Sequence, residues 1–216
     1  MPASVKPAPA PSPVKEHVEV KKVKAAHPAP YVEPSEQELK DHLVYRFAAR
    51  EKFVESGIFV LNVSLVDYYK HFQADDSAFG HPKFWHHKKM RNVTTAKWDD
   101  EAPADFTTTF EGCPNTLKYR KQNGIADVKG IPMVSEADVT KHYMIYEQSD
   151  LHLRLKCITR TAKVPNGDKA QTEEAWDIVT KDPRSRFVAV RHSLFVHFFS
   201  RPYLIANKME TSMKTK

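Results

Sequence analysis

The sequence predicts an α+β protein in which helices come first and an antiparallel sheet follows. Most helical patterns fall before about residue 85, and from about residue 90 onward the chain alternates strand patterns with short turns. Short turns between consecutive strands favour an antiparallel meander, and the separation of helices from strands argues against an alternating α/β fold. With 41% hydrophobic residues in a chain of 216, a substantial core can be buried.

The first 34 residues differ in composition from the rest and predict an extended tail. They contain eight of the 15 prolines and no glycine. Proline and alanine favour polyproline II, which has no internal hydrogen bonds and no core. Two roles stay open for this tail: a solubilising spacer, or an anchor that becomes ordered along a protein partner. The lysines expected to act in such an anchor are Lys15, Lys21, Lys22 and Lys24.

An amphipathic helix is predicted over roughly residues 36–56, as the main element of a segment spanning 35–57. Ser35 and Glu38 have the spacing of a capping box, in which each side chain accepts a hydrogen bond from the other residue's backbone N–H. Gly57 supplies a stop signal. The apolar positions at helical spacing are Leu39, Leu43, Val44, Phe47 and Phe53.

A buried strand is predicted at residues 58–63, followed by two short helices. Ser64 has the character of an N-cap for the first of them. Asp75-Asp76-Ser77 is expected to begin the second, which runs through Phe79 and Phe84. Asn123-Gly124 is interpreted as a turn, like Asp182-Pro183. The strands predicted after this region are residues 90–98, 105–111, 116–122, 134–148, 150–160, 170–180 and 186–199.

The last strands alternate in a way that predicts one covered and one solvent-exposed face. In 150–160 the apolar set is Leu151, Leu153, Leu155 and Cys157, while His152, Arg154, Lys156 and Arg160 point the other way. In 186–199 the side chains that share a face are Val188, Val190, His192, Leu194, Val196 and Phe198.

Composition and motifs argue against an enzyme. The net charge of +6 is mild; it suits an anionic lipid surface, an acidic protein or nucleic acid without requiring any of them. No nucleophile elbow, phosphate-binding loop or metalloprotease motif occurs, and the two cysteines form no C-x-x-C pair. We therefore expect no catalytic residues, no cofactor and no metal, and no recognised module points to nucleic acid. The absence of a secretory or transit signal favours an intracellular, cytoplasmic protein.

Local motifs along residues 62–199 resemble one known family. In chain order they are Asn62 to Tyr69, Asp75 to Phe79, Trp98, Leu117 to Arg120, the turn Val164-Pro165-Asn166-Gly167-Asp168, the strand with Glu173, Glu174 and Trp176, and the aromatic end Phe195, His197, Phe198 and Phe199. Together these resemble the VASt domain, a relative of the StAR-related lipid-transfer fold.

This resemblance implies a helix-grip (START/Bet v 1-like) fold over residues 58–210, in which a curved antiparallel sheet and a C-terminal helix enclose a cavity for a sterol or phospholipid. The family's closing helix is longer than residues 201–216 allow here, so we expect a short C-terminal helix with a polar end at 211–216, and the helix predicted at 36–56 is an alternative cover. The residues expected to face the cavity are Leu151, Leu153, Leu155, Trp176, His192, Leu194 and Phe198.

Two polar features have both a functional and a structural interpretation. His192 on its apolar strand face could bind a lipid hydroxyl, or it could be a core histidine hydrogen-bonded by its neighbours. The basic-aromatic stretch near residue 85 could contact an anionic membrane or an acidic protein, or its aromatic residues could belong to the core. Its contact residues would be Lys83, Phe84, Trp85, Lys88, Lys89 and Arg91.

Two functions therefore follow from the sequence. The first is a non-catalytic VASt-like module that binds a sterol or phospholipid and uses a basic tail to bind a partner. The alternative is a scaffold subunit of a cytoskeletal or membrane-associated assembly that uses the same fold without lipid transfer. A cavity would favour the first function, and a sheet filled by its own side chains (Trp176, Phe195 and Phe198) would favour the second.

Overall fold

The computed structural model describes residues 30–104, 106, 116–129, 131 and 133–200. The chain divides into two units, residues 1–32 and 33–216, and all elements below belong to the second. The lysines predicted as a tail anchor, most of the strand predicted at 105–111, and the C-terminal helix expected after residue 200 lie outside the described residues.

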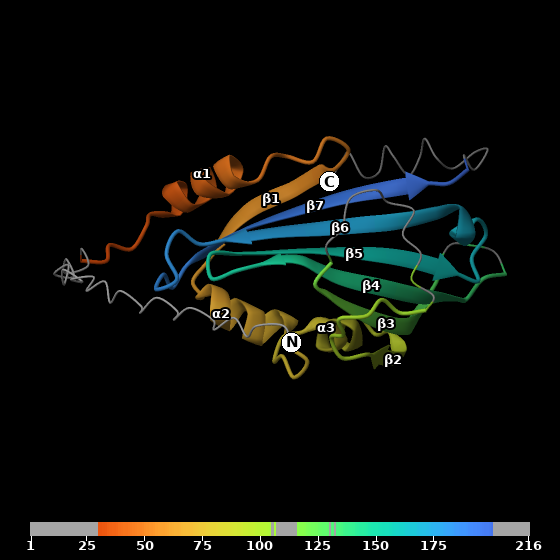
Figure 1. The fold of residues 1–216 in the computed structure, drawn as a ribbon. Helices are drawn as coiled ribbons and strands as arrows, with labels where there is room; N and C mark the ends of the chain where they lie inside the picture. Colours follow the sequence, from red (N-terminus) through yellow and green to blue (C-terminus); the bar gives the residue numbers. More distant parts are fainter. Residues whose placement is uncertain (1–29, 105, 107–115, 130, 132, 201–216) are drawn as a thin grey trace, which may run out of the picture. The chain divides into compact units, whose positions relative to one another are not determined.

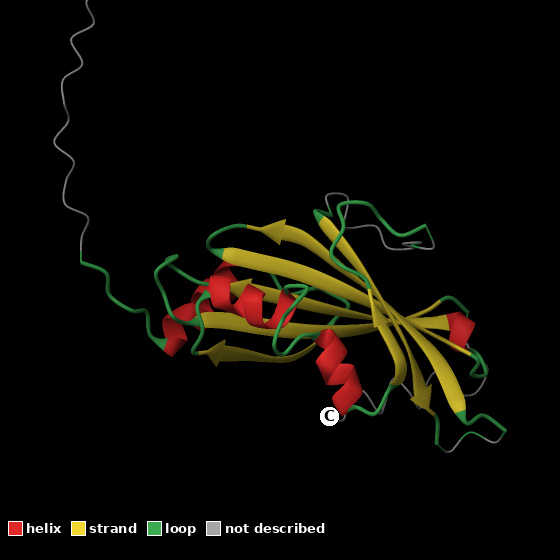
Figure 2. Cartoon of the chain, turned by 90° about the horizontal axis from the view of Figure 1, so that it is seen from below, coloured by secondary structure: helices red, strands yellow, loops and turns green. Residues whose placement is uncertain are grey.

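Seven antiparallel strands form one curved, open sheet (Figures 1 and 2). The order across the sheet is β1-β7-β6-β5-β4-β3-β2, so β2 to β7 form a meander and β1 pairs with the last strand. This arrangement confirms the predicted α+β class with an antiparallel sheet. The strands are β1 Val54–Leu61, β2 Arg91–Thr95, β3 Lys118–Asp127, β4 Glu136–Gln148, β5 His152–Ala162, β6 Ala170–Val179 and β7 Val188–Phe198.

Short helices lie before and between the strands. They are α1 Glu36–Arg46, α2 Leu65–Tyr68, which continues as a π-helix at Tyr69–Gln73, α3 His81–His87, and a 3-10 turn at Gly167–Lys169. The predicted capping box is present in α1: the Glu38 N–H donates to Ser35 Oγ at 3.3 Å, and the Ser35 N–H donates to Glu38 Oε2 at 2.9 Å. Ser64 caps α2 as predicted.

The two faces of the sheet carry separate apolar cores. On the face that we call the α2 face, Leu65 and Tyr68 pack against Leu155 and Ile178, together with Ile145, Leu153, Val188 and Val190. On the opposite face, the α1 face, Leu39, Leu43 and Phe47 pack against Val179 and Ala189. In Figure 1, α1 runs alongside β1 and β7, whereas α2 and α3 lie on the other side of the sheet.

The predicted helix over 36–56 is wrong beyond its third turn. It ends at Arg46, and the chain enters β1 at Val54. Gly57 does not stop a helix; it has φ +144° beside an irregularity in the pairing of β1 with β7, a backbone conformation that favours glycine. The helix predicted to begin at Asp75 starts later than expected. This helix, α3, begins at His81, after Gly80.

The turn predicted at Asn123-Gly124 is also wrong, because both residues lie within β3. Gly124 is instead a site of close approach. A Cβ atom at this position would lie 2.7 Å from Cζ3 of Trp85, so the missing side chain lets the indole pack directly on the strand.

The sheet face that we predicted to be solvent-exposed is buried in its central part, so the prediction is wrong there. On the α1 face Asp177, Arg191 and Glu173 are each almost fully buried. Asp177 accepts hydrogen bonds from Arg50, Arg154 and Arg191 at 2.7–2.9 Å. Lys156, which we expected to be solvated, forms a buried ion pair with Glu173 at 2.7 Å. Buried charges of this kind are tolerated because they are paired.

Among the described residues, no helix has both the length and the apolar character needed to cross a membrane.

Candidate functional site

A cavity of about 410 Å³ lies on the α2 face, between the short helices and strands β4, β6 and β7. Seven aromatic rings make up most of its lining: Tyr68, Phe72, Phe79, Phe84, Trp85, Tyr143 and Trp176. The other lining residues are polar, namely Gln73, His81, Lys141, Glu174 and His192. We call this space the aromatic cavity.

The cavity walls are built from rings held against one another. Tyr68 and Phe72, one helical turn apart, have centroids 5.0 Å apart, and Phe72 lies 6.0 Å from Phe79. Opposite them, Trp176 of β6 lies 5.1 Å from the imidazole of its cross-strand neighbour His192. The aromatic faces provide apolar contact area with few internal degrees of freedom.

A charged pair lies within this aromatic lining. Lys141 Nζ lies 2.6 Å from Glu174 Oε1, and both side chains are mostly buried. Burial by itself would raise the pKa of Glu174, but hydrogen bonds from His192 and Lys141 outweigh burial and lower the pKa to about 2. Glu174 is therefore ionised at neutral pH, and its charge is balanced mainly by Lys141.

His192 has a hydrogen-bonding partner at one of its two ring nitrogens. Its Nδ1 lies 2.9 Å from Ser56 Oγ of β1, and its Nε2 lies 3.6 Å from Glu174 Oε2. The side chain thus links β1, β6 and β7 at the wall of the cavity.

His81, at the first position of α3, is a polar residue that we did not predict for the site. Its ring lies 4.2 Å from that of Tyr143. Its Nε2 is buried and has no hydrogen-bonding partner among the described residues. Burial, followed by the positive charges of Lys141 and Arg120, lowers the pKa of His81 to about 4. The imidazole is therefore neutral at physiological pH.

Tyr143 lines the cavity, and Cys157 is fully buried on the neighbouring strand β5. The Tyr143 hydroxyl donates to Gln122 Oε1 at 3.1 Å. Burial raises the pKa of the fully buried Cys157 thiol to about 12, so the reactive thiolate is absent at neutral pH.

Two of the seven residues predicted to face a cavity line the aromatic cavity, and the other five do not. Trp176 and His192 line the aromatic cavity. Leu153 and Leu155 lie beneath α2 in the core, and Leu151 lies in the turn before β5 with 40% of its surface exposed. Leu194 and Phe198 are half-buried on β7 and do not line the cavity.

Among the residues predicted to contact a membrane or acidic partner, the two aromatic side chains differ. Trp85 is buried with 3% exposure, whereas Phe84 is 53% exposed at the rim of the cavity. Arg91 forms ion pairs with Asp127 and Glu136, so its charge is largely balanced. The remaining cationic side chains of the segment, Lys83, Lys88 and Lys89, are exposed.

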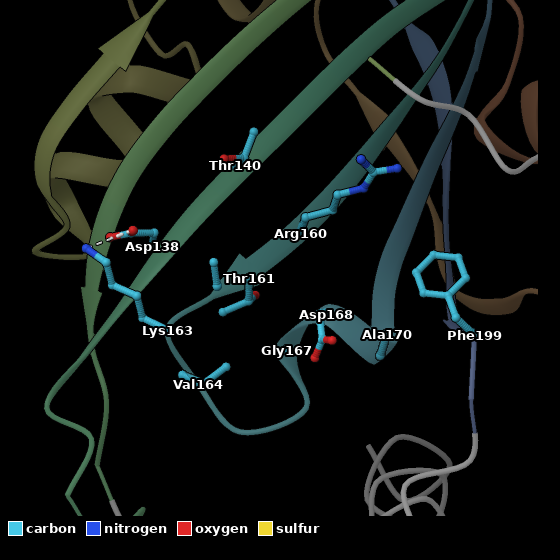
Figure 3. A pocket seen from close by; sticks show the side chains of 11 residues that line it. Asp138, Thr140, Arg160, Thr161, Lys163, Val164, Gly167, Asp168, Ala170 and Phe199 are labelled. Atoms are coloured by element: carbon cyan, nitrogen blue, oxygen red, sulfur yellow. Dashed lines mark ion pairs between the residues drawn. The ribbon is translucent and has the colours of Figure 1, made fainter. Parts of the chain in front are cut away.

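A second hollow, of about 560 Å³, lies near the β5–β6 turn (Figure 3). Its lining includes charged side chains: Lys163 and Asp138 form an ion pair at 2.9 Å, and Arg160 donates to Gln171 at 3.3 Å. Phe199 is the one aromatic residue among the described residues that line it (Figure 3). This hollow lacks the aromatic walls of the aromatic cavity.

The described residues contain no group of three or more His, Cys, Asp or Glu side chains that could hold a metal ion.

Neither models of known protein families nor the curated proteins contain a match to this chain. The resemblance to the VASt domain therefore depends on the local motifs alone, and function must be argued from the aromatic cavity.

Proposed function

We propose that this chain is a non-catalytic, VASt-like lipid-binding module whose ligand occupies the aromatic cavity. The observation that carries the proposal is the cavity itself, an open space of about 410 Å³ lined by seven aromatic rings and a few polar groups. Pockets for small ligands have this character and range from about 300 to 1,000 Å³. The volume lies near the lower limit, which favours a sterol over a phospholipid with two acyl chains.

The topology supports a helix-grip fold as the framework of this module. The two short helices α2 and α3 are inserted between β1 and β2, and β1 pairs with β7 at the edge of the sheet. This insertion places Tyr68, Phe72 and Trp85 over the sheet, opposite Trp176. The ligand would then be held between the helices and the sheet.

The rim of the cavity offers a surface that suits an anionic membrane. Phe79 and Phe84 are 68% and 53% exposed at this rim, and the exposed Lys83, Lys88 and Lys89 lie in or next to α3. Exposed aromatic rings can enter the headgroup region while lysines contact acidic lipids. Docking through this surface would bring the cavity to its ligand.

Sterol binding can be tested with dehydroergosterol, whose fluorescence changes when it enters an apolar site. We expect the wild-type protein to bind it, and we expect Phe79→Ala and Phe84→Ala each to weaken binding severalfold because each removes part of the wall. Phe59→Ala is the matched control: this ring is 52% exposed on β1 and does not line the cavity.

Failure of the wild-type protein to bind dehydroergosterol, together with native mass spectra that show no retained lipid, would contradict the proposal. That outcome would favour the scaffold function instead.

Membrane docking has its own test, in which the protein is floated with vesicles. We expect vesicles with phosphatidylserine to carry the protein and vesicles of phosphatidylcholine alone to carry little of it. Replacement of Lys83, Lys88 and Lys89 by glutamine should abolish the difference. The control replaces Lys52, Lys97 and Lys129, which are exposed elsewhere; equal loss in both triple variants would show that overall charge, not this rim, is responsible.

A further inference from the structure

Three buried hydrogen-bonding atoms of residues that line the aromatic cavity have no hydrogen-bonding partner among the described residues: Gln73 Oε1, His81 Nε2 and His192 Nε2. Nε2 of His192 lies 3.6 Å from Glu174 Oε2. Nε2 of His81 is inaccessible to solvent and meets no donor or acceptor among the described residues. The centroid of the His81 ring lies 4.2 Å from the centroid of the Tyr143 ring and 6.3 Å from that of Trp176. All three residues line the cavity. Leaving a buried polar atom without a partner is unfavourable, so a ligand that forms a hydrogen bond with it would gain affinity.

Several neighbouring polar groups already have partners, although Gln73 Oε1 and His192 Nε2 do not. The Lys141 ammonium is held by Glu174 at 2.6 Å, and the Tyr143 hydroxyl is held by Gln122 at 3.1 Å. Nδ1 of His192 is held by Ser56. A ligand can therefore satisfy His81 without breaking any of these interactions.

The charges around His81 limit the kind of group that can bind there. Lys141 and Arg120 both disfavour a positive charge at this position. A buried anion needs a cation of its own, and Lys141, the one lysine or arginine among the described residues that line the cavity, is paired with the ionised Glu174. A ligand carboxylate would have to compete with Glu174 for it. A hydroxyl group both donates and accepts, so it suits either tautomer of a neutral imidazole.

We propose that the cavity selects ligands whose single polar group is an uncharged hydroxyl, and that Nε2 of His81 is the atom that binds it. This inference rests on the proposed lipid-binding function and specifies the headgroup that the cavity accepts. Aliphatic acids and amines of the same length are excluded by the same arrangement.

The inference can be tested with 1-dodecanol, dodecanoate and dodecylamine, which share one chain and differ in the headgroup. Isothermal titration at pH 7.4 should show that the wild-type protein binds dodecanol at least about tenfold more tightly than the other two, given the cost of burying an unpaired charge. In His81→Phe, which keeps an apolar ring at this place, dodecanol should bind about fivefold to tenfold more weakly through the loss of one hydrogen bond.

Glu174→Gln provides the reciprocal test, because it leaves Lys141 free to accept an anion. We expect this variant to bind dodecanoate more tightly than dodecanol, and dodecanoate to raise its melting temperature. The thermal shift keeps the test valid when the variant is less stable than wild type, since a ligand that binds the folded state stabilises it.

The outcomes separate the headgroup inference from the lipid-binding function. If the wild-type protein binds dodecanoate as tightly as dodecanol, or if His81→Phe leaves dodecanol affinity unchanged, the headgroup inference is overturned while lipid binding stands. If the wild-type protein binds none of the three dodecyl compounds and no dehydroergosterol, the proposed function itself fails.

Discussion

Acid is expected to destabilise this domain through His81, well above the pH at which carboxylates titrate. In the folded protein the pKa of His81 is lowered to about 4 from 6.5. As the pH falls below 6.5, the unfolded chain binds a proton that the folded chain does not bind, so stability decreases until the pH reaches about 4. At about 1.36 kcal/mol for each pH unit, the loss between pH 7 and pH 5 is roughly 2 kcal/mol.

Urea unfolding at pH 7 and pH 5 measures this loss directly. His81→Gln replaces the imidazole with a polar group that does not titrate, so this variant should lose about 2 kcal/mol less than wild type over the same interval. Glu174, whose pKa is lowered to about 2, contributes its own loss only below about pH 4.5 and leaves this window unaffected. The matched control is His86→Gln, at an exposed position of α3. An equal loss of stability in wild type and His81→Gln would refute the reasoning.

Three further predictions concern the packing that supports the site. Asp177→Asn should reduce the free energy of unfolding by about 3–5 kcal/mol, because it removes the charge shared by Arg50, Arg154 and Arg191, whereas Asp76→Asn, at an exposed position, should have little effect in the same urea titration. Gly124→Val should cost roughly 1–3 kcal/mol and change the near-ultraviolet circular dichroism, since its side chain would collide with Trp85; an unchanged spectrum would contradict the close approach. Phe47→Ala should destabilise by about 3–5 kcal/mol and speed hydrogen exchange in α1, because the ring is buried beneath Arg154, while Tyr45→Ala, 89% exposed on the same helix, should do neither.

Local rules were sufficient for the elements whose signals are local. The capping box at Ser35 and the alternation of β5 and β7 predicted real elements because each depends on residues a few positions apart. The helix prediction failed after Arg46 because Val54 to Gly57 pair with β7, about 135 residues away in sequence. This long-range pairing outweighs the helical spacing of the apolar residues. The turn prediction at Asn123-Gly124 failed because the glycine makes room for the Trp85 ring within a strand and does not form a turn.

Much of the candidate site lay beyond the reach of the sequence. His192 was found because it interrupts an apolar strand face, and Trp176 was found through the motifs that resemble the VASt domain. His81 was not singled out from the sequence, since its burial depends on the approach of Tyr143 from β4. The pairing of Lys141 with Glu174 joins two strands that are not neighbours in the sheet, and it has no signature at the level of spacing.

The most direct test of this account is the side-chain ¹H–¹⁵N spectrum of the histidines during a titration with dodecanol. The account predicts that the Nε2 resonance of His81 shifts and saturates with the bound fraction, while the resonances of the exposed His86 stay in place. If dodecanol binds and the His81 resonance does not move, or if no binding occurs at all, the claim that the aromatic cavity holds an alcohol at His81 is contradicted.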